Sequence, residues 1–299
     1  MRTKTRRFWL MDLLLVLGMV LPLVVGIALK ILFTPPQNGI EIRGALVYFS
    51  LPMPFFSWPI TEALLNLGLS LCTLTCLCLF LTHGIRARVR TRRQTVAEWI
   101  VERVQSMVKE NMGEHFLRFS PFIGALLGLS GLCGLLSLLG LYTPTRDLSV
   151  VAGWAILIFA LITYYKTRAG ALVYIESFGK PLMLAPLNVV GELATPVSMA
   201  FRQYGNILAG AVIMQLVAYG LQGLSEWAFG FLPFGLARAG ILRIGIPAIL
   251  SIYFDLFSSL LQAYILAMLT MLYVSRGYPQ REVEKREQRR RASKGRIEA

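Results

Sequence analysis

The chain has 299 residues and a formal net charge of +14; it is 56% hydrophobic and only 15% charged, and its mean hydropathy is +0.61. Soluble domains carry about 25% charged residues, so this composition excludes a disordered chain, argues against a water-soluble enzyme and predicts an all-α polytopic membrane protein. Eighteen of the 30 lysines and arginines fall in three clusters, at 1–7, 86–93 and 276–299. Basic clusters beside apolar segments indicate membrane topology rather than a nucleic-acid-binding surface.

The first predicted element is a retained membrane helix from Trp9 to Phe33. Its length of about 25 residues exceeds the apolar region of a signal peptide. A proline-rich stretch follows, which predicts a loop. A second membrane helix is predicted from Ile60 to Thr82, and the arginines of 86–93 end it.

The segment from Gln94 to Phe116 is predicted to be an amphipathic helix rather than a membrane span. Its apolar residues recur at steps of 4, 4, 3 and 1, with charged residues between them, which places them on one helical face. These residues are Val96, Ile100, Val104, Met107 and Val108. Such a helix can lie on the membrane surface or pack on the rest of the protein, and the two interpretations are compatible.

Two short spans are predicted next, Phe122 to Leu141 and Leu148 to Tyr165, joined by a turn at 143–147. The last two apolar runs, Leu182 to Gly220 and Leu242 to Val274, are longer. At 1.5 Å per residue each would extend roughly 45–60 Å, against about 30 Å for a bilayer core. We therefore expect two strongly tilted helices that form a hairpin.

About six crossings place both termini on one side of the membrane. The basic clusters and the charges that follow the fourth span then lie on that same side. The positive-inside rule identifies this side as the cytoplasm. We therefore expect cytoplasmic N- and C-termini.

Polar side chains recur along one face of the fifth predicted helix, at steps of 4, 3, 3, 4 and 4. They are Asn188, Glu192, Thr195, Ser198, Arg202 and Asn206. Eighteen residues separate the first from the last, which is five helical turns. An arginine at mid-membrane costs about 2.5–3.5 kcal/mol on insertion scales, so Arg202 requires compensation.

The sixth predicted helix carries a weaker polar face, formed by Ser251, Asp255, Ser258, Ser259 and Gln262. Together the two faces predict an ion path at membrane depth, with a fixed positive charge part-way along it. The structural alternative is an ion pair of Arg202 with Asp255 or Glu192 inside a packed bundle. A buried lysine can lose its proton whereas arginine keeps its charge, and a permanent charge is what a gate for a carboxylate requires.

At these residues the chain resembles subunit a of the bacterial F-type ATP synthases. The resemblance rests on the 186–196 segment, on Arg202 followed by Gly205-Asn206, and on Gln262-Ala-Tyr-Ile in the last helix. It covers roughly residues 57–275. It implies an a-subunit membrane domain at 57–275, preceded by an extra membrane helix and external loop at 1–56. A basic cytoplasmic tail follows at 276–299.

The resemblance also implies a mechanism and a set of partners. Subunit a is a stator with two half-channels that couple H⁺ flow to rotation of a c-subunit ring and to ATP synthesis. The implied partners are the c ring, the b subunits of the peripheral stalk, other ATP synthase subunits and membrane lipid, and the implied location is the bacterial inner membrane. Arg202 would face the c-subunit carboxylate as the gate. The half-channel or relay residues would be Glu192, Asp255, Asn206, Gln262, Asn188, Ser198 and Ser251.

Two positions depart from the family pattern. Ala211 stands where many members have a carboxylate, and Asp255 stands where others have His, Glu or Gly. We expect Asp255 to supply the relay carboxylate from the last helix instead.

We expect no cofactor, no metal site, no nucleic-acid binding and no direct nucleotide binding. The chain has only two histidines and no Gly-x-x-x-x-Gly-Lys-Ser/Thr loop. Its four cysteines, at 72, 76, 78 and 133, lie in apolar runs and are expected to be reduced, buried thiols, since their spacing fits no zinc pattern. The chain would be a non-catalytic subunit of an ATP synthase complex.

Other functions fit parts of the sequence. The first is a Na⁺-coupled version of the same subunit. The second is a secondary ion transporter, which an inverted repeat would favour. The third is an intramembrane protease, because Gly128-Leu-Ser-Gly131 matches a nucleophile pattern, but no histidine follows His115 as its partner.

Overall fold

The computed structural model describes residues 2–33, 44–52, 57–84, 92–168, 185–229 and 249–277. Within these residues six helical segments are long and apolar enough to cross a membrane, which confirms the predicted fold class. They are Trp9–Phe33, Glu62–Thr82, Glu114–Leu139, Leu148–Thr167, Leu193–Ser225 and Ile249–Ser275.

The main helices lie close to the predicted runs. They are α1 (Arg2–Phe33), α2 (Glu62–Thr82), α3 (Arg92–Met112), α4 (Ser120–Leu135), α5 (Leu148–Arg168), α7 (Ala185–Phe229) and α9 (Ser259–Gly277). Short 3-10 helices flank α4 and fill the turn after it, namely η1 (Glu114–Phe119), η2 (Leu136–Leu139) and η3 (Pro144–Arg146). A π-helical segment, η5 (Ile252–Ser258), precedes α9. The predicted start of the last run, at 242–248, lies outside the described residues.

The proline-rich stretch contains a β-hairpin that the loop prediction missed. β1 (Val47–Pro52) pairs antiparallel with β2 (Ser57–Thr61), from Val47 opposite Thr61 to Pro52 opposite Ser57. A two-stranded sheet has only edge strands, and an edge strand tolerates a residue without a backbone N–H group. The prolines therefore did not exclude strands here.

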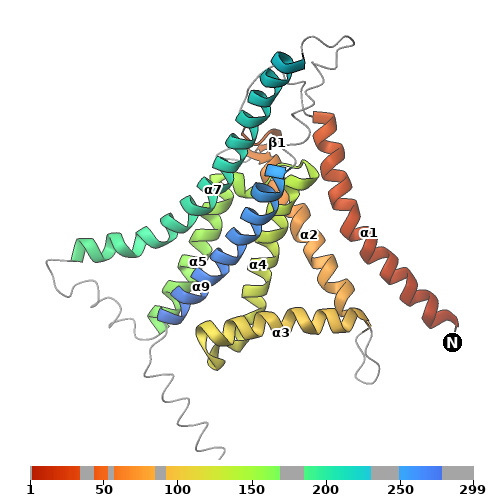
Figure 1. Ribbon diagram of the computed structural model, residues 1–299. Coiled ribbons are helices and arrows are strands. Elements are labelled where there is room, and N and C mark those ends of the chain that lie inside the picture. The colour runs from red at the N-terminus through yellow and green to blue at the C-terminus, as the bar shows by residue number, and fades with distance from the viewer. Residues whose placement is uncertain are drawn as a thin grey trace, which may run out of the picture.

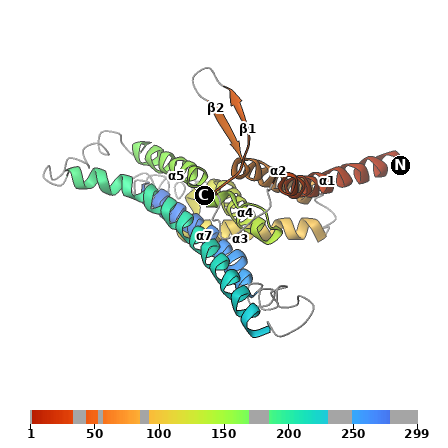
Figure 2. The same cartoon turned by 90° about the horizontal axis from the view of Figure 1, so that it is seen from above.

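The helices form an open bundle with two distinct ends. In Figure 1, α3 lies across one end, near the start of α1 and the end of α9, and β1 lies at the other end. Figure 2 shows the β1–β2 hairpin projecting from the start of α2, with α7 beside α9. At 45 residues, α7 is roughly 68 Å long, about twice the thickness of a bilayer core. It runs obliquely to α4 and alongside α9 (Figures 1 and 2).

Helix α1 packs along α2 and is anchored at both ends. Near its start, the Asp12 carboxylate accepts a hydrogen bond from Arg93 Nη1 at 2.8 Å and lies 3.2 Å from His83 Nδ1. Near its end, Lys30 Nζ donates to the carbonyl of Gly140. The extra N-terminal helix is therefore held by polar contacts to the α2–α3 connection and to the turn after α4.

The contact between α1 and α2 also depends on a glycine. A Cβ atom on Gly18 would lie 2.8 Å from Cys76 Sγ, so a larger residue there would force the Cys76 side chain to move. Of the four cysteines, Cys133 is buried but Cys72 and Cys78 are exposed on α2. The prediction of four buried thiols is wrong because an apolar membrane helix exposes apolar residues to lipid as readily as it buries them.

Packing on the rest of the protein applies to one half of α3, and the membrane-surface interpretation of the other half stays a prediction. Val108 is fully buried in the core cluster, whereas Val96 and Ile100 are 48% and 41% exposed. The second half of α3 therefore packs on the bundle. The first half keeps its apolar face open, as a surface helix on a membrane would.

We expect Gly134→Ala to destabilise the bundle, because α4 meets the start of α9 at this glycine. A Cβ atom there would lie 2.5 Å from Ser259 Cβ, so the two helices must move apart. Overpacking of this kind costs about 1–3 kcal/mol, and the unfolding midpoint of the purified protein in detergent should fall. Gly153→Ala is the matched control, since a Cβ atom there meets nothing within 4 Å. Equal midpoints for the two variants would contradict the packing.

Candidate functional site

Helix α7 presents one of its faces to the rest of the bundle. Met199 and Ala200 are buried. Gln203 is 1% exposed, and its Nε2 donates to Ser130 Oγ on α4 at 3.2 Å. These contacts fix the rotation of α7 about its own axis.

That rotation turns the predicted polar stripe outward. Ser198, Arg202 and Asn206 are all exposed, and they lie among exposed apolar side chains such as Val197 and Phe201. An arginine that faced lipid directly at membrane depth would be costly. The outward face of α7 therefore has the composition of a surface that another protein covers.

The structural alternative for Arg202, an ion pair with Asp255, is not formed. Among the side chains that the structure describes, no carboxylate forms an ion pair with Arg202. Asn188 and Glu192 lie on α7, but their side chains are outside the described part.

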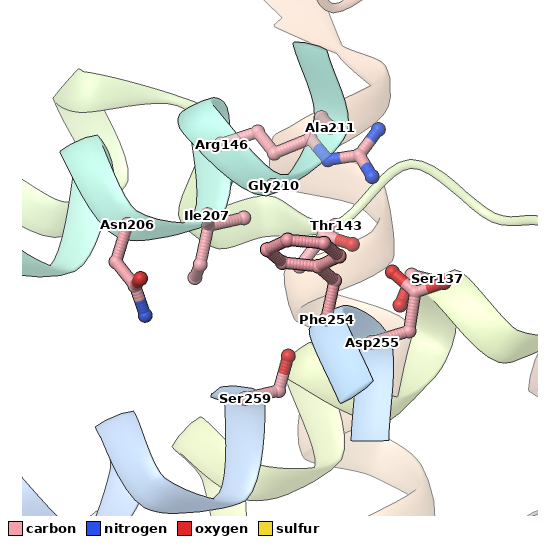
Figure 3. A pocket seen from close by; sticks show the side chains of 10 residues that line it. All are labelled: Ser137, Thr143, Arg146, Asn206, Ile207, Gly210, Ala211, Phe254, Asp255 and Ser259. Carbon is pink, nitrogen blue, oxygen red and sulfur yellow. The ribbon is translucent and has the colours of Figure 1, made fainter. Parts of the chain in front are cut away.

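A small polar cavity lies between α7 and the segment that leads into α9. Its volume is about 10 Å³, room for about one water molecule. Six of the side chains around it are polar, as Figure 3 shows: Ser137, Thr143, Arg146, Asn206, Asp255 and Ser259. Two of the predicted site residues, Asn206 and Asp255, thus meet here.

The cavity also holds both positions that depart from the family pattern. Ala211 on α7 and Asp255 on η5 line it together (Figure 3). The two elements approach closely beside it, since a Cβ atom on Gly210 would lie 3.1 Å from Phe254 Cδ1. A carboxylate from η5 therefore enters the same space that a carboxylate at position 211 would border.

Local backbone geometry positions Asp255. η5 is a π-helical segment, and such segments within helices are frequent at functional sites. It is joined to α7 by a hydrogen bond from Asn206 Nδ2 to Ser258 Oγ at 2.8 Å.

The other predicted site residues are not gathered at the cavity. Gln262 is buried on α9, Ser251 is half-buried just before η5, and Ser198 is exposed on α7. None of these three lines the cavity. Within the described ranges, no group of three His, Cys, Asp or Glu side chains could hold a metal ion.

Arg146 is the residue that the sequence analysis missed, because it was treated as part of a turn. Its side chain lines the cavity from η3. Its Nε and the nearby Thr143 Oγ1 are buried without a hydrogen-bond partner. The available signal was topological: a lone arginine between two spans, on the side opposite the basic clusters, departs from the positive-inside pattern.

The charge of Arg146 acts on its neighbours in the same turn. Burial raises the pKa of the Tyr142 phenol above its ordinary value, and the charge of Asp147 raises it further, whereas Arg146 opposes the rise. The Tyr142 carbonyl accepts a hydrogen bond from Asn66 Nδ2 at 2.8 Å. This bond ties the turn to the first part of α2.

Comparison with known proteins gives a consistent match over the membrane region. A family model described as ATP synthase A chain matches residues 64–275. ATP synthase subunit a of Listeria welshimeri serovar 6b is 31% identical over 220 residues, which cover 68% of this chain and 87% of the relative. The protein of the same name from Staphylococcus saprophyticus is 31% identical over 206 residues, 65% of this chain and 80% of the relative. That from Bacillus pumilus is 31% identical over 197 residues, 62% and 79% respectively.

Proposed function

The chain belongs to the ATP synthase A chain family, and from this premise we propose that it is the ion-translocating stator subunit a of an F-type ATP synthase. The observation that carries the proposal is the family match across the spans from α2 to α9, which include the outward-facing arginine. In this function the subunit couples H⁺ flow through the membrane to ATP synthesis. The match does not favour the Na⁺-coupled alternative, and it leaves no support for a secondary transporter.

We assign the role of gate to Arg202. Its exposed position on α7 and its lack of an ion partner among the described side chains support this role. A c-subunit carboxylate that passes Arg202 is stabilised in its ionised form, so its proton leaves there. Arginine keeps its charge throughout, and an ion therefore cannot bypass rotation at this point.

We assign the relay to Asp255, with Asn206 as its polar neighbour across the cavity. Both side chains line a space that accommodates about one water molecule, and a carboxylate beside water can take up and release protons. Asn188, Glu192 and Ser198 on α7, and Ser251 and Gln262 on the last helix, are further half-channel candidates.

We also propose the partners, the orientation and the domain boundaries of the subunit. The outward face of α7 suits the c ring, and the b subunits of the peripheral stalk are further partners. The basic clusters support cytoplasmic termini in a bacterial inner membrane. The family match begins at residue 64, which supports a membrane domain at 57–275 with 1–56 and 276–299 as separate additions.

Cysteine cross-linking tests the contact with the c ring. Phe201 lies beside Arg202 and is 58% exposed. In a variant without the four native cysteines, Phe201→Cys should form a disulfide with a cysteine placed beside the c-subunit carboxylate. Leu13→Cys is the control, since Leu13 is 67% exposed on α1, and the N-terminal end of that helix lies away from α7 in both views (Figures 1 and 2). Cross-links from Leu13→Cys without any from Phe201→Cys would contradict the assignment.

A further inference from the structure

We propose that Arg146 is a positioning residue for the proton relay, and that its fixed charge acts on the Asp255 carboxylate across the cavity that both side chains line. This inference rests on the proposed role of Asp255. It adds a second functional arginine, distinct from Arg202, at the end of the bundle away from α3.

The first support is the cavity itself. Arg146 and Asp255 are the two charged side chains that line it. They enter from separate elements, η3 and η5, as Figure 3 shows. They form no direct ion pair, so the carboxylate stays open to the cavity while the guanidinium charge acts across it.

The second support is the environment of the Arg146 guanidinium: the residue is half-buried, and its Nε atom is buried. That Nε atom has no hydrogen-bond partner among the described residues. A guanidinium cannot relieve this by losing its proton, so its position is stabilised mainly by a nearby anion. At a partly buried site, a charge interaction across the cavity is stronger than in bulk water.

The other charged groups nearby are weaker candidates for that anion. Asp147 Oδ1 accepts a hydrogen bond from Ser149 N at 3.0 Å and so caps α5. Glu62, at the start of α2, does not line the cavity. Asp255 is therefore the anion that shares an open space with Arg146.

The elements packed against η5 add no competing charge at the cavity. α4 and η2 contain no charged residue, and α9 carries only Arg276 at its far end. On α7, Arg202 and Tyr204 lie four and two residues before Asn206, but neither lines the cavity.

The arrangement gives Arg146 a specific part in the proton path. A proton that arrives at Asp255 does so in a cavity that the fixed positive charge of Arg146 also lines, and that charge favours onward transfer of the proton. Without Arg146, release toward the c ring becomes slower.

The test uses the whole ATP synthase in proteoliposomes, with synthesis driven by an imposed proton-motive force. Arg146→Gln should lower the rate at neutral pH by about tenfold, the order expected when a unit charge beside a carboxylate is removed. The rate profile against the pH on the η3 side should also move to higher pH. Arg146→Lys keeps the charge and should restore most of the rate and the position of the profile. The matched control is Arg118→Gln, an exposed arginine on η1 away from the cavity.

A double-mutant cycle separates this role from a structural one. If Arg146 acts through Asp255, Arg146→Gln combined with Asp255→Asn should be no slower than Asp255→Asn alone. A rate that falls equally at every pH, or effects that multiply in the double variant, would overturn the proposal. If Asp255→Asn is inactive while Arg146→Gln synthesises ATP at the wild-type rate, the role of Arg146 is rejected and the relay role of Asp255 stands. Normal synthesis by Asp255→Asn would instead reject the relay itself.

Discussion

Replacing Arg202 with lysine should abolish ion-driven ATP synthesis while the complex still assembles. Lysine keeps the positive charge at neutral pH in water, but it loses the planar fork of donors and can lose its proton when desolvated beside the c ring. Loss of preorganised charge at a reacting centre commonly lowers rates by about 100-fold or more. We expect a loss of that size in synthesis, measured in proteoliposomes beside the passive proton leak of the membrane sector.

The matched control for this change is Arg103→Lys on α3, an exposed arginine over the Trp99 ring. It should assemble and synthesise ATP at the wild-type rate. Co-purification of the c ring with each variant tests assembly separately from function. Near-normal ATP synthesis by Arg202→Lys would contradict the assignment of Arg202 as the gate. Glu192 and Asp255 would then be the next residues to test.

The sequence predicted the helices because each one carries its own pattern. The apolar runs reveal the spans, and steps of three and four residues reveal both α3 and the stripe on α7. The β1–β2 hairpin carried no such pattern, since Pro52 and Pro59 lie in strands that are both edges. The low strand propensity of proline argued against strands here. Proline is nevertheless tolerated in an edge strand, because one side of that strand has no neighbour to hydrogen-bond.

The candidate site was predictable only in part, because its geometry depends on segments that are far apart in the sequence. Periodicity placed Arg202 and Asn206 on one face, but which face α7 turns outward is decided by partners such as Ser130 for Gln203. The meeting of Arg146 with Asp255 brings together η3 and η5, more than 100 residues apart in the chain. No local pattern encodes which distant segments line one cavity, so only the fold could reveal it.

Asp255→Asn should reduce ATP synthesis by about 100-fold, the usual effect of removing a positioned acid–base group. Asparagine keeps the size and polarity of the side chain, so packing around η5 should be preserved. Ser275→Ala is the control, because Ser275 lies near the end of α9 and does not line the cavity. Wild-type synthesis by Asp255→Asn would show that no proton passes through this carboxylate.

The sharper test moves the carboxylate across the cavity. Ala211 and Asp255 line the same space from α7 and η5 (Figure 3). Ala211→Glu combined with Asp255→Asn should therefore recover at least about a tenth of the wild-type rate of ATP synthesis. The reason is that general acid–base action depends on the reach of the group and not on the element that carries it. Ala211→Glu alone places two carboxylates around one cavity, where like charges oppose joint ionisation, and it should be slower than the wild type. Rescue in the double variant would show that the path requires a carboxylate in this cavity. A double variant as inactive as Asp255→Asn would instead tie the relay to the geometry of η5.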